Sequence, residues 1–228
     1  MSGHSKWHNI QKTKGAQDAK RAAAFTKIAK EMIVAVKEGG GSIDPAYNSR
    51  LATIITKAKA ANMPNDNIKR VLEKAGSAGS GDSYESITYE GYGPGGVAVI
   101  VEAMTDNRNR TAGSVRHHFD KYGGNLGANG CVSWSFDKKG VLVIDNEDGD
   151  YEEDEVMMDA MDCGADDFNA VADALTAKKY TFVSAQIEMV PQNYVKLSPE
   201  DAERMEKMLD LFEDDDDVQN TWHNWDQE

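Results

Sequence analysis

The chain lacks any hydrophobic run long enough to cross a membrane. A membrane-spanning helix needs about 18 or more consecutive apolar residues, and the longest apolar stretch here, Val97–Val101, has only the length of a strand. The residues before Trp7 also lack the apolar core of a secretion signal. We therefore expect a cytoplasmic protein that makes no membrane contact.

Cysteine and catalytic motifs are equally scarce. The two cysteines, Cys131 and Cys163, belong to no CxxC pair and have no histidine at ligand spacing, which suits a reducing compartment and argues against a zinc site. The acid-rich stretches Asp145–Glu155 and Asp214–Asp217 lack the spacing of an EF-hand and are interpreted as solvated loops. We expect no metal and no cofactor.

No G-x-S-x-G, H-E-x-x-H or dinucleotide-binding fingerprint occurs in the chain. The glycine-rich segment Glu90–Gly96 lacks the Gly-Lys-Ser/Thr of a phosphate loop and precedes a strand, so a tight turn is the better interpretation. The sequence therefore predicts a protein that is not an enzyme.

Charge of the two signs is unevenly distributed. Residues 1–80 contain 14 Lys or Arg and 6 Asp or Glu, a net charge of +8, whereas residues 81–228 contain 11 and 33, a net charge of −22. Such a split indicates a segment that binds polyanions attached to an acidic body. Because the acidic body repels phosphate, any contact with nucleic acid has to be local and oriented.

Helical periodicity dominates residues 1–80. The pattern predicts helices from Asp18 to about Glu38, from Asp44-Pro45 to about Ala61, and from Pro64 to Gly76. Residues 76–83 are rich in Gly and Ser and form the clearest linker in the chain. We therefore predict a basic helical domain over 1–80.

The remainder alternates between strand and helix patterns, which predicts an α+β fold. Strands are expected at 86–90, 97–103, 131–136, 141–144, 182–190, 194–197 and 218–222, and helices at 106–122, 152–163, 168–178 and 199–212. This order suggests an N-terminal three-helix bundle plus two interleaved ferredoxin-like α/β sandwich domains. The first sandwich would be discontinuous, 81–137 with 192–228, and the second would be inserted over 138–191.

The N-terminal basic segment is the first candidate site. It has one acid, Asp18, and its cations could neutralise phosphates, while aromatic rings at its start could stack on unpaired bases. A solvated helix face is the alternative for the cations and packing is the alternative for Trp7. The expected ligands are Lys6, Trp7, His8, Lys12, Lys14, Lys20, Arg21, Lys27 and Lys30.

Helical geometry narrows this surface further. Lys20, Lys27, Lys30 and Lys37 fall opposite the apolar stripe of the first predicted helix and so define its polyanion face. That face otherwise offers mainly alanine, which contacts phosphates but cannot discriminate between base edges.

Arg108 and Arg110 form the second candidate site. Two arginines in a first helical turn oppose the helix dipole at a cost of roughly 0.3–1 kcal/mol each unless an anion lies nearby. That anion could be a nucleic-acid phosphate or one of the chain's own acids, such as Asp106 or Asp120, and the sequence favours neither.

Several long motifs carry a resemblance to a known family. They are Gly3-His4-Ser5-Lys6-Trp7 with Phe25-Thr26-Lys27, Thr88–Ala98, Thr105–Thr111, Gly123–Gly127 and the tail around Asp217–Asn224. In this order they resemble the YebC family, the bacterial relatives of the mitochondrial translational activator of cytochrome oxidase subunit I. The resemblance implies a non-enzymatic cytoplasmic protein of three domains.

The chain departs from the family pattern in two places. Lys12-Thr13 stand where the family usually has a His-Arg pair, which removes a histidine-specific role but keeps one positive charge. Near Gly164–Phe168 the family has a further stretch that supplies strands of the inserted domain. Either the inserted domain of this protein is truly shorter, or the sequence omits a loop that the protein has. A sheet without its middle strands would be unstable, which favours the second explanation.

The resemblance implies a role in gene expression. Members are named probable transcriptional regulatory proteins that bind DNA, and part of the family is regarded as ribosome-associated translation factors that bind ribosomal RNA and relieve stalling at proline-rich sequences. The partner is therefore expected to be DNA or ribosomal RNA, with the ribosome as the wider partner, and the chain is expected to be a monomer. A small-molecule sensor ranks last, because no residue pattern specifies a ligand.

Overall fold

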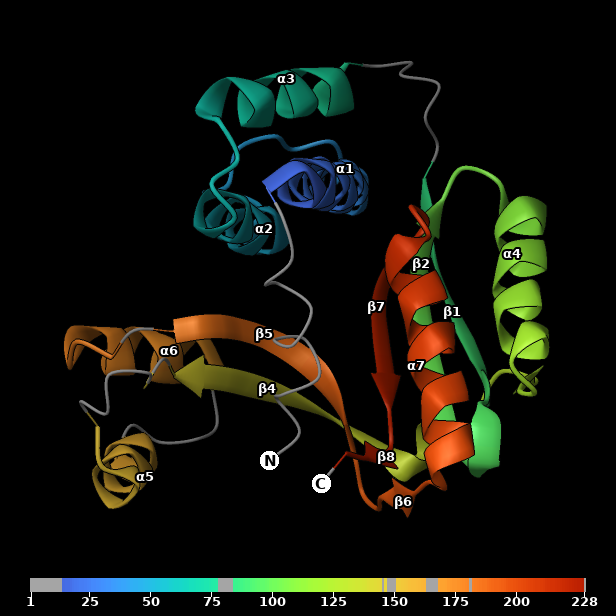
Figure 1. Ribbon diagram of the computed structural model, residues 1–228. Coiled ribbons are helices and arrows are strands. Elements are labelled where there is room, and N and C mark those ends of the chain that lie inside the picture. Colours follow the sequence, from blue (N-terminus) through green and yellow to red (C-terminus); the bar gives the residue numbers. More distant parts are fainter. Residues whose placement is uncertain are drawn as a thin grey trace. The chain divides into compact units, whose positions relative to one another are not determined.

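A computed structural model describes residues 14–77, 84–144, 146, 151–162, 168–180 and 182–227 (Figure 1). Phe136–Gln192 forms one compact unit, and the other described residues form a second. No helix in these ranges is long and apolar enough to span a bilayer. The expected α+β class with N-terminal helices is confirmed, whereas the division into three domains stays a prediction.

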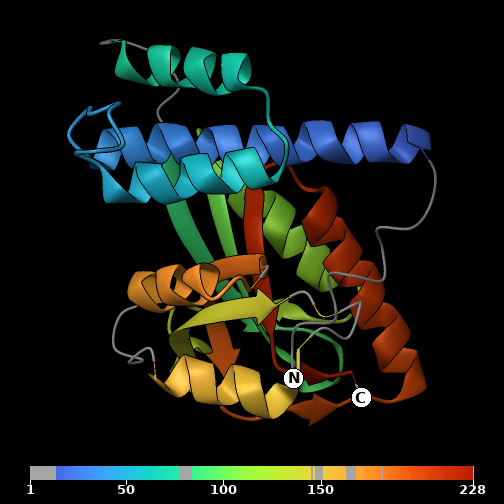
Figure 2. The same cartoon turned by 90° about the vertical axis from the view of Figure 1, so that its left-hand side faces the viewer.

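Three helices begin the second unit. They are α1 (Lys14–Glu38), α2 (Ser49–Ala60) and α3 (Asn65–Gly76), and Figure 2 shows the long α1 flanked by the other two. Their apolar faces meet in one cluster, centred on Met32, Leu51 and Ala58, which have no exposed surface. Burial of such a shared face is what stabilises short helices in water.

Two predicted helix starts are wrong. Helix α1 begins at Lys14, so Asp18 lies inside it and does not cap it. Helix α2 begins four residues after Pro45, because Asn48 supplies the cap: its Oδ1 accepts the Leu51 amide at 3.1 Å. Asp44 instead caps a short turn by accepting the Ala46 amide at 2.9 Å.

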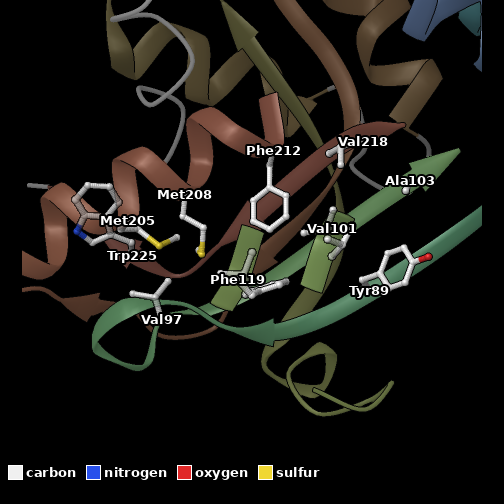
Figure 3. Packing of buried hydrophobic residues seen from close by; sticks show 12 residues of the cluster. Tyr89, Val97, Val101, Ala103, Phe119, Met205, Met208, Phe212, Val218 and Trp225 are labelled. Atoms are coloured by element: carbon white, nitrogen blue, oxygen red, sulfur yellow. The ribbon is translucent and has the colours of Figure 1, made fainter. Parts of the chain in front are cut away.

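A four-stranded antiparallel sheet is the main element in the rest of this unit. Its order is β3 (Asn125–Leu126), β1 (Glu85–Tyr92), β2 (Ala98–Thr105) and β7 (Val218–His223). Helices α4 (Arg108–Lys121) and α7 (Pro199–Asp214) contribute Phe119, Met205, Met208 and Phe212 to the sheet's hydrophobic core (Figure 3). Val115 of α4 belongs to the same core. Two further short strands, β6 (Val195–Lys196) and β8 (Trp225–Asp226), pair in parallel.

The strand predicted at 131–136 is wrong. Strand β1 pairs with β2 along its full length instead, from Glu85 opposite Thr105 to Tyr92 opposite Ala98. Residues 127–135 form a loop that ends in a short 3-10 turn at Ser133–Ser135. The tight turn predicted between β1 and β2 is confirmed, since Gly95 and Gly96 have φ angles of 64° and 80°, a region that favours glycine.

The other unit contains one strand pair and two helices among its described residues. Strand β4 (Phe136–Ile144) pairs antiparallel with β5 (Phe182–Pro191), and between them in sequence come α5 (Glu153–Asp162) and α6 (Phe168–Ala177). The junction at 163–167, where the family has its further stretch, lies outside the described residues.

We expect Asn48→Ala to loosen the start of α2. The 7% exposed Asn48 side chain also donates to the carbonyl of Ala35 at 2.9 Å, so it joins α2 to α1. Losing the cap and a buried hydrogen bond should cost about 1–3 kcal/mol. Hydrogen exchange at the amides of Leu51 and Ala52 should accelerate accordingly, while the exposed neighbour variant Ser49→Ala should leave it unchanged. Equal protection in both variants would contradict the capping role.

Candidate nucleic-acid interface

A cleft of about 600 Å³ lies among α1, the start of α4 and the connection from α7 to β7. Its walls carry charges of both signs, and all of them belong to one compact unit. The charged and polar lining consists of Thr26, Lys30, Tyr84, Asp106, Arg110, Ser114, His118, Asp214, Asp215, Asp216 and Asp217.

The carboxylate of Asp217 accepts hydrogen bonds from several side chains in and beside this cleft. One carboxylate oxygen accepts the Lys30 ammonium at 2.8 Å, and the other accepts Arg110 at 2.8 Å and the Thr111 hydroxyl at 2.8 Å. Its backbone carbonyl accepts the amide of Met104 at 2.7 Å. A single residue thus ties together α1, α4 and the end of β2.

The protonation of Asp217 follows from these contacts. Burial by itself raises the pKa of this carboxyl, but the hydrogen bonds from Lys30, Arg110 and Thr111 outweigh it and lower the pKa to about 2. The same carboxylate raises the pKa of the Arg110 guanidinium. Asp217 is therefore ionised throughout the physiological range. Its earlier interpretation as part of a solvated acidic loop is wrong, since it is 7% exposed.

The predicted polyanion face of α1 is partly covered at the side chains that the structure describes. Lys30, expected to be exposed, is 7% exposed, and its ammonium also donates to the carbonyl of Asp216 at 2.7 Å. Lys27 is half-buried and donates to the carbonyl of Glu213 at 2.8 Å. Burial lowers the pKa of Lys27, and the nearby acids Glu213, Asp215 and Asp216 partly offset this. Lys37 is exposed and donates to the carbonyl of Tyr84 at 3.3 Å.

The two arginines of α4 have intramolecular partners as well. Arg110 binds Asp106 at 2.8 Å in addition to Asp217, and Arg108 binds Glu85 at 3.0 Å. Asn107 caps the helix by accepting the amide of Arg110 at 3.1 Å, which places both guanidinium groups beside these acids. The structure thus supplies, from the chain itself, the anions that arginines in a first helical turn require.

The other expected ligands divide into two groups. Arg21 is exposed on α1. Lys6, Trp7, His8 and Lys12, and the side chains of Lys14 and Lys20, lie outside the described residues. The structure therefore brings Lys27, Lys30 and Arg110 together around one acidic segment, and phosphate binding by all these residues stays a prediction.

Ser114, His118 and Asp215 meet in the same cleft without forming a nucleophilic triad. Asp215 accepts the Ser114 hydroxyl at 2.8 Å and faces Nε2 of His118 at 3.0 Å. A triad needs the carboxylate on one ring nitrogen and serine on the other, but here Nδ1 of His118 is buried without a partner. Burial raises the pKa of Asp215, and hydrogen bonds from the Asp217 amide, Ser114 and His118 outweigh it, so the pKa is lowered.

The sequence did not reveal a second buried acid, Glu90. Its carboxylate accepts the amides of Gly130, Val132 and Ser133 at 2.8–2.9 Å. These bonds lower the pKa of Glu90 although burial opposes them. They hold the 127–135 loop, on which Trp134 stands 69% exposed. The periodicity of apolar residues gives no signal for a carboxylate that accepts backbone amides 40 or more residues away along the chain.

Within the described ranges, no three or more His, Cys, Asp or Glu side chains are grouped to hold a metal ion. The cleft is lined by charges of both signs. The described part of the chain is an α+β protein that begins with three helices.

Comparison with known sequences identifies the family. The sequence model of the TACO1/YebC N-terminal domain matches residues 5–78, and that of the second and third TACO1/YebC domains matches residues 84–225. The chain belongs to the TACO1/YebC family, which confirms the resemblance noted from its motifs.

Relatives resemble the chain over nearly its whole length. A probable transcriptional regulatory protein of Finegoldia magna is 52% identical over 245 residues, covering 100% of both chains. One of Clostridium botulinum is 52% identical over 240 residues, covering 98% of this chain and 96% of its own. The crystal structure of a conserved hypothetical protein from Aquifex aeolicus aligns with a TM-score of 0.84 at 38% identity, covering 97% of each chain.

We expect Asp217→Asn to destabilise the protein at neutral pH, because it leaves buried Lys30 without its carboxylate. Breaking one partner of a buried ion pair costs about 3 kcal/mol. Since the pKa of Asp217 is lowered, its contribution is fully present above the unfolded value of about 3.9 and is lost as pH falls towards 2. Denaturant unfolding from pH 7 to 2 should therefore show a shallower pH dependence in the variant. The exposed control Asp214→Asn should retain the wild-type profile, and parallel profiles for Asp217→Asn and wild type would refute this role.

Proposed function

We propose that this protein is a non-enzymatic regulator of gene expression that binds nucleic acid through its basic N-terminal segment. The observation that carries the proposal is the charge split, +8 over residues 1–80 against −22 over residues 81–228. The names of the relatives, probable transcriptional regulatory proteins at 52% identity, support the same role.

Phosphate contact is the mode of binding that this segment favours. Each cation that neutralises a phosphate releases condensed counterions. The logarithm of the affinity therefore falls by about 0.7–0.9 per contact for each tenfold increase in salt concentration. The acidic body repels the same polyanion and so confines contact to the basic side. Binding would therefore be strong at low salt and oriented.

Sequence discrimination is expected to be weak. The exposed residues at the described start of α1 are Arg21, Ala22, Ala24 and Thr26, so three of the four are small. A recognition helix reads bases with three or four longer polar side chains. This favours contact with the sugar–phosphate backbone, and it makes a translation factor on ribosomal RNA the second candidate beside a regulator on DNA.

One pair of assays separates the two candidates. Co-sedimentation with bacterial ribosomes and a gel shift with duplex promoter DNA are compared at the same physiological salt. Salt-stable pelleting with only nonspecific DNA binding would refute the transcriptional role, whereas protection of a defined DNA sequence would refute the ribosomal one.

Charge reversal tests the site itself. We expect the variant with Lys12, Lys14, Lys20 and Arg21 all changed to Glu to lose binding at physiological salt. At low salt, where residual binding is measured, the slope of log affinity against log salt concentration should fall in magnitude by roughly 3, because about four phosphate contacts are lost. Fluorescence anisotropy of a labelled 20-nucleotide RNA and a 20-base-pair DNA measures both.

The matched control reverses four exposed lysines elsewhere, Lys121, Lys138, Lys139 and Lys196. It changes the net charge by the same amount and should weaken binding only modestly. Equal losses in both variants would show that net charge alone matters, and an unchanged salt slope in the N-terminal variant would place the site elsewhere.

A further inference from the structure

Three methionines lie exposed on helix α5. Met157, Met158 and Met161 are 54%, 61% and 73% exposed. At about 100° per residue they fall on one side of the helix, within about 100° of arc. Methionine is among the residue types most often buried, and neighbouring exposed apolar side chains mark interaction surfaces. The methionines of α5 therefore indicate a surface that a partner covers.

Contacts on the opposite side of α5 fix this orientation. The Asp159 carboxylate accepts the Tyr180 hydroxyl at 2.9 Å and the Lys178 ammonium at 2.5 Å. Both partners follow α6 in the chain, and Tyr180 is 7% exposed. A rotation of α5 that buried the methionines would break both contacts. The methionines are thus held outward within the unit Phe136–Gln192.

The sequence around α5 is acidic and contains no cation. Residues 140–177 contain 13 Asp or Glu and no Lys or Arg. On α5 itself, Asp154, Glu155 and Asp162 are exposed, and at about 100° per residue they fall within or beside the arc of the methionines. Like charges at an interface repel and opposite charges attract. This surface therefore excludes a phosphate polymer and favours a cationic partner.

We propose that α5 docks a basic amphipathic helix of another protein. The docking surface, here called the α5 surface, consists of Met157, Met158, Met161, Asp154, Glu155 and Asp162. Apolar side chains three and four residues apart on the partner cover the methionines, and its Lys and Arg side chains meet the three acids. Methionine side chains are flexible and polarisable, so they fit apolar partners of different shapes. None of these residues belongs to the proposed nucleic-acid site, so each proposal can fail without the other.

A synthetic peptide of about 18 residues, five helical turns, tests this docking. It carries leucines three and four residues apart and lysines elsewhere, and its control is a scrambled peptide of the same composition. Fluorescence anisotropy with the full chain at physiological salt should show the amphipathic peptide binding at least about tenfold more tightly, because only it gathers its leucines against the methionines. Equal affinities would show attraction by charge alone and refute the proposal.

Replacing the methionines tests their part in the contact. Glutamine has nearly the same helix propensity as methionine, so M157Q/M158Q/M161Q should keep α5 helical by circular dichroism. It should lower the affinity for the amphipathic peptide about tenfold, to that of the scrambled peptide. The matched control Y47Q/W134Q/Y194Q replaces three exposed side chains of the other unit and should change the affinity less than about twofold. Unchanged binding by the methionine variant, or equal losses in both variants, would contradict the proposal.

Neutralising the acids tests the charge of the partner. The variant D154N/E155Q/D162N keeps the methionines and Asp159. It should bind both peptides about fivefold more weakly and with a smaller dependence on salt, because attraction between exposed charges is screened by ions. Undiminished binding of the amphipathic peptide would show that the surface does not select a basic partner and would overturn the proposal.

Two measurements on the wild-type chain need no substitution. In a methyl NMR titration with the amphipathic peptide, the signals of Met157, Met158 and Met161 should shift, whereas those of Met205 and Met208, which have no exposed surface, should not. Unmoved signals from all three α5 methionines would place the peptide elsewhere and refute the docking. Light scattering of the chain alone should show no dimer that the methionine variant loses. Such a dimer would show that a second copy covers the α5 surface, against the proposal.

Discussion

The unit that contains the cleft depends on one ionised carboxylate. Asp217 satisfies Lys30 from α1, Arg110 and Thr111 from α4, and the amide of Met104 at the end of β2. A buried ammonium without a partner would be costly, so these elements are tied to the same anion. The helices α1–α3 and the sheet have separate apolar clusters. The contacts of Asp217 link α1 to α4 and to the end of β2.

The charge split acquires a physical meaning from this contact. The net charge of +8 over residues 1–80, taken alone, suggests that cations of this segment are free for a polyanionic partner. The described structure instead gives Arg108 and Arg110 acidic partners, and it places Lys27 and Lys30 against the acidic run Glu213–Asp217 at the end of α7. The basic segment is thus partly neutralised by the acidic body.

Local features of the fold were predictable because their causes are local. The Asn107 cap, the Ser198-Pro199 start of α7 and the glycine turn before β2 each follow from neighbouring residues. The start of α2 was misplaced because Asn48 caps it while bonding to Ala35 on another helix. The strand expected at 131–136 failed because Glu90 accepts the loop's amides, which removes the reason for those residues to pair in a sheet.

The sequence predicted which residue types make up the candidate site, but it did not predict how exposed Lys27 and Lys30 are. Helical geometry gives the direction of Lys27 and Lys30 relative to the apolar stripe of α1, but it cannot reveal what lies against that face. The answer is an acidic run 186 residues away from each lysine. Lys30 is fixed by a buried ion pair with Asp217, so its position depends on the fold around it. In the described structure Lys27 donates a hydrogen bond to the backbone carbonyl of Glu213, and its position depends on the end of α7.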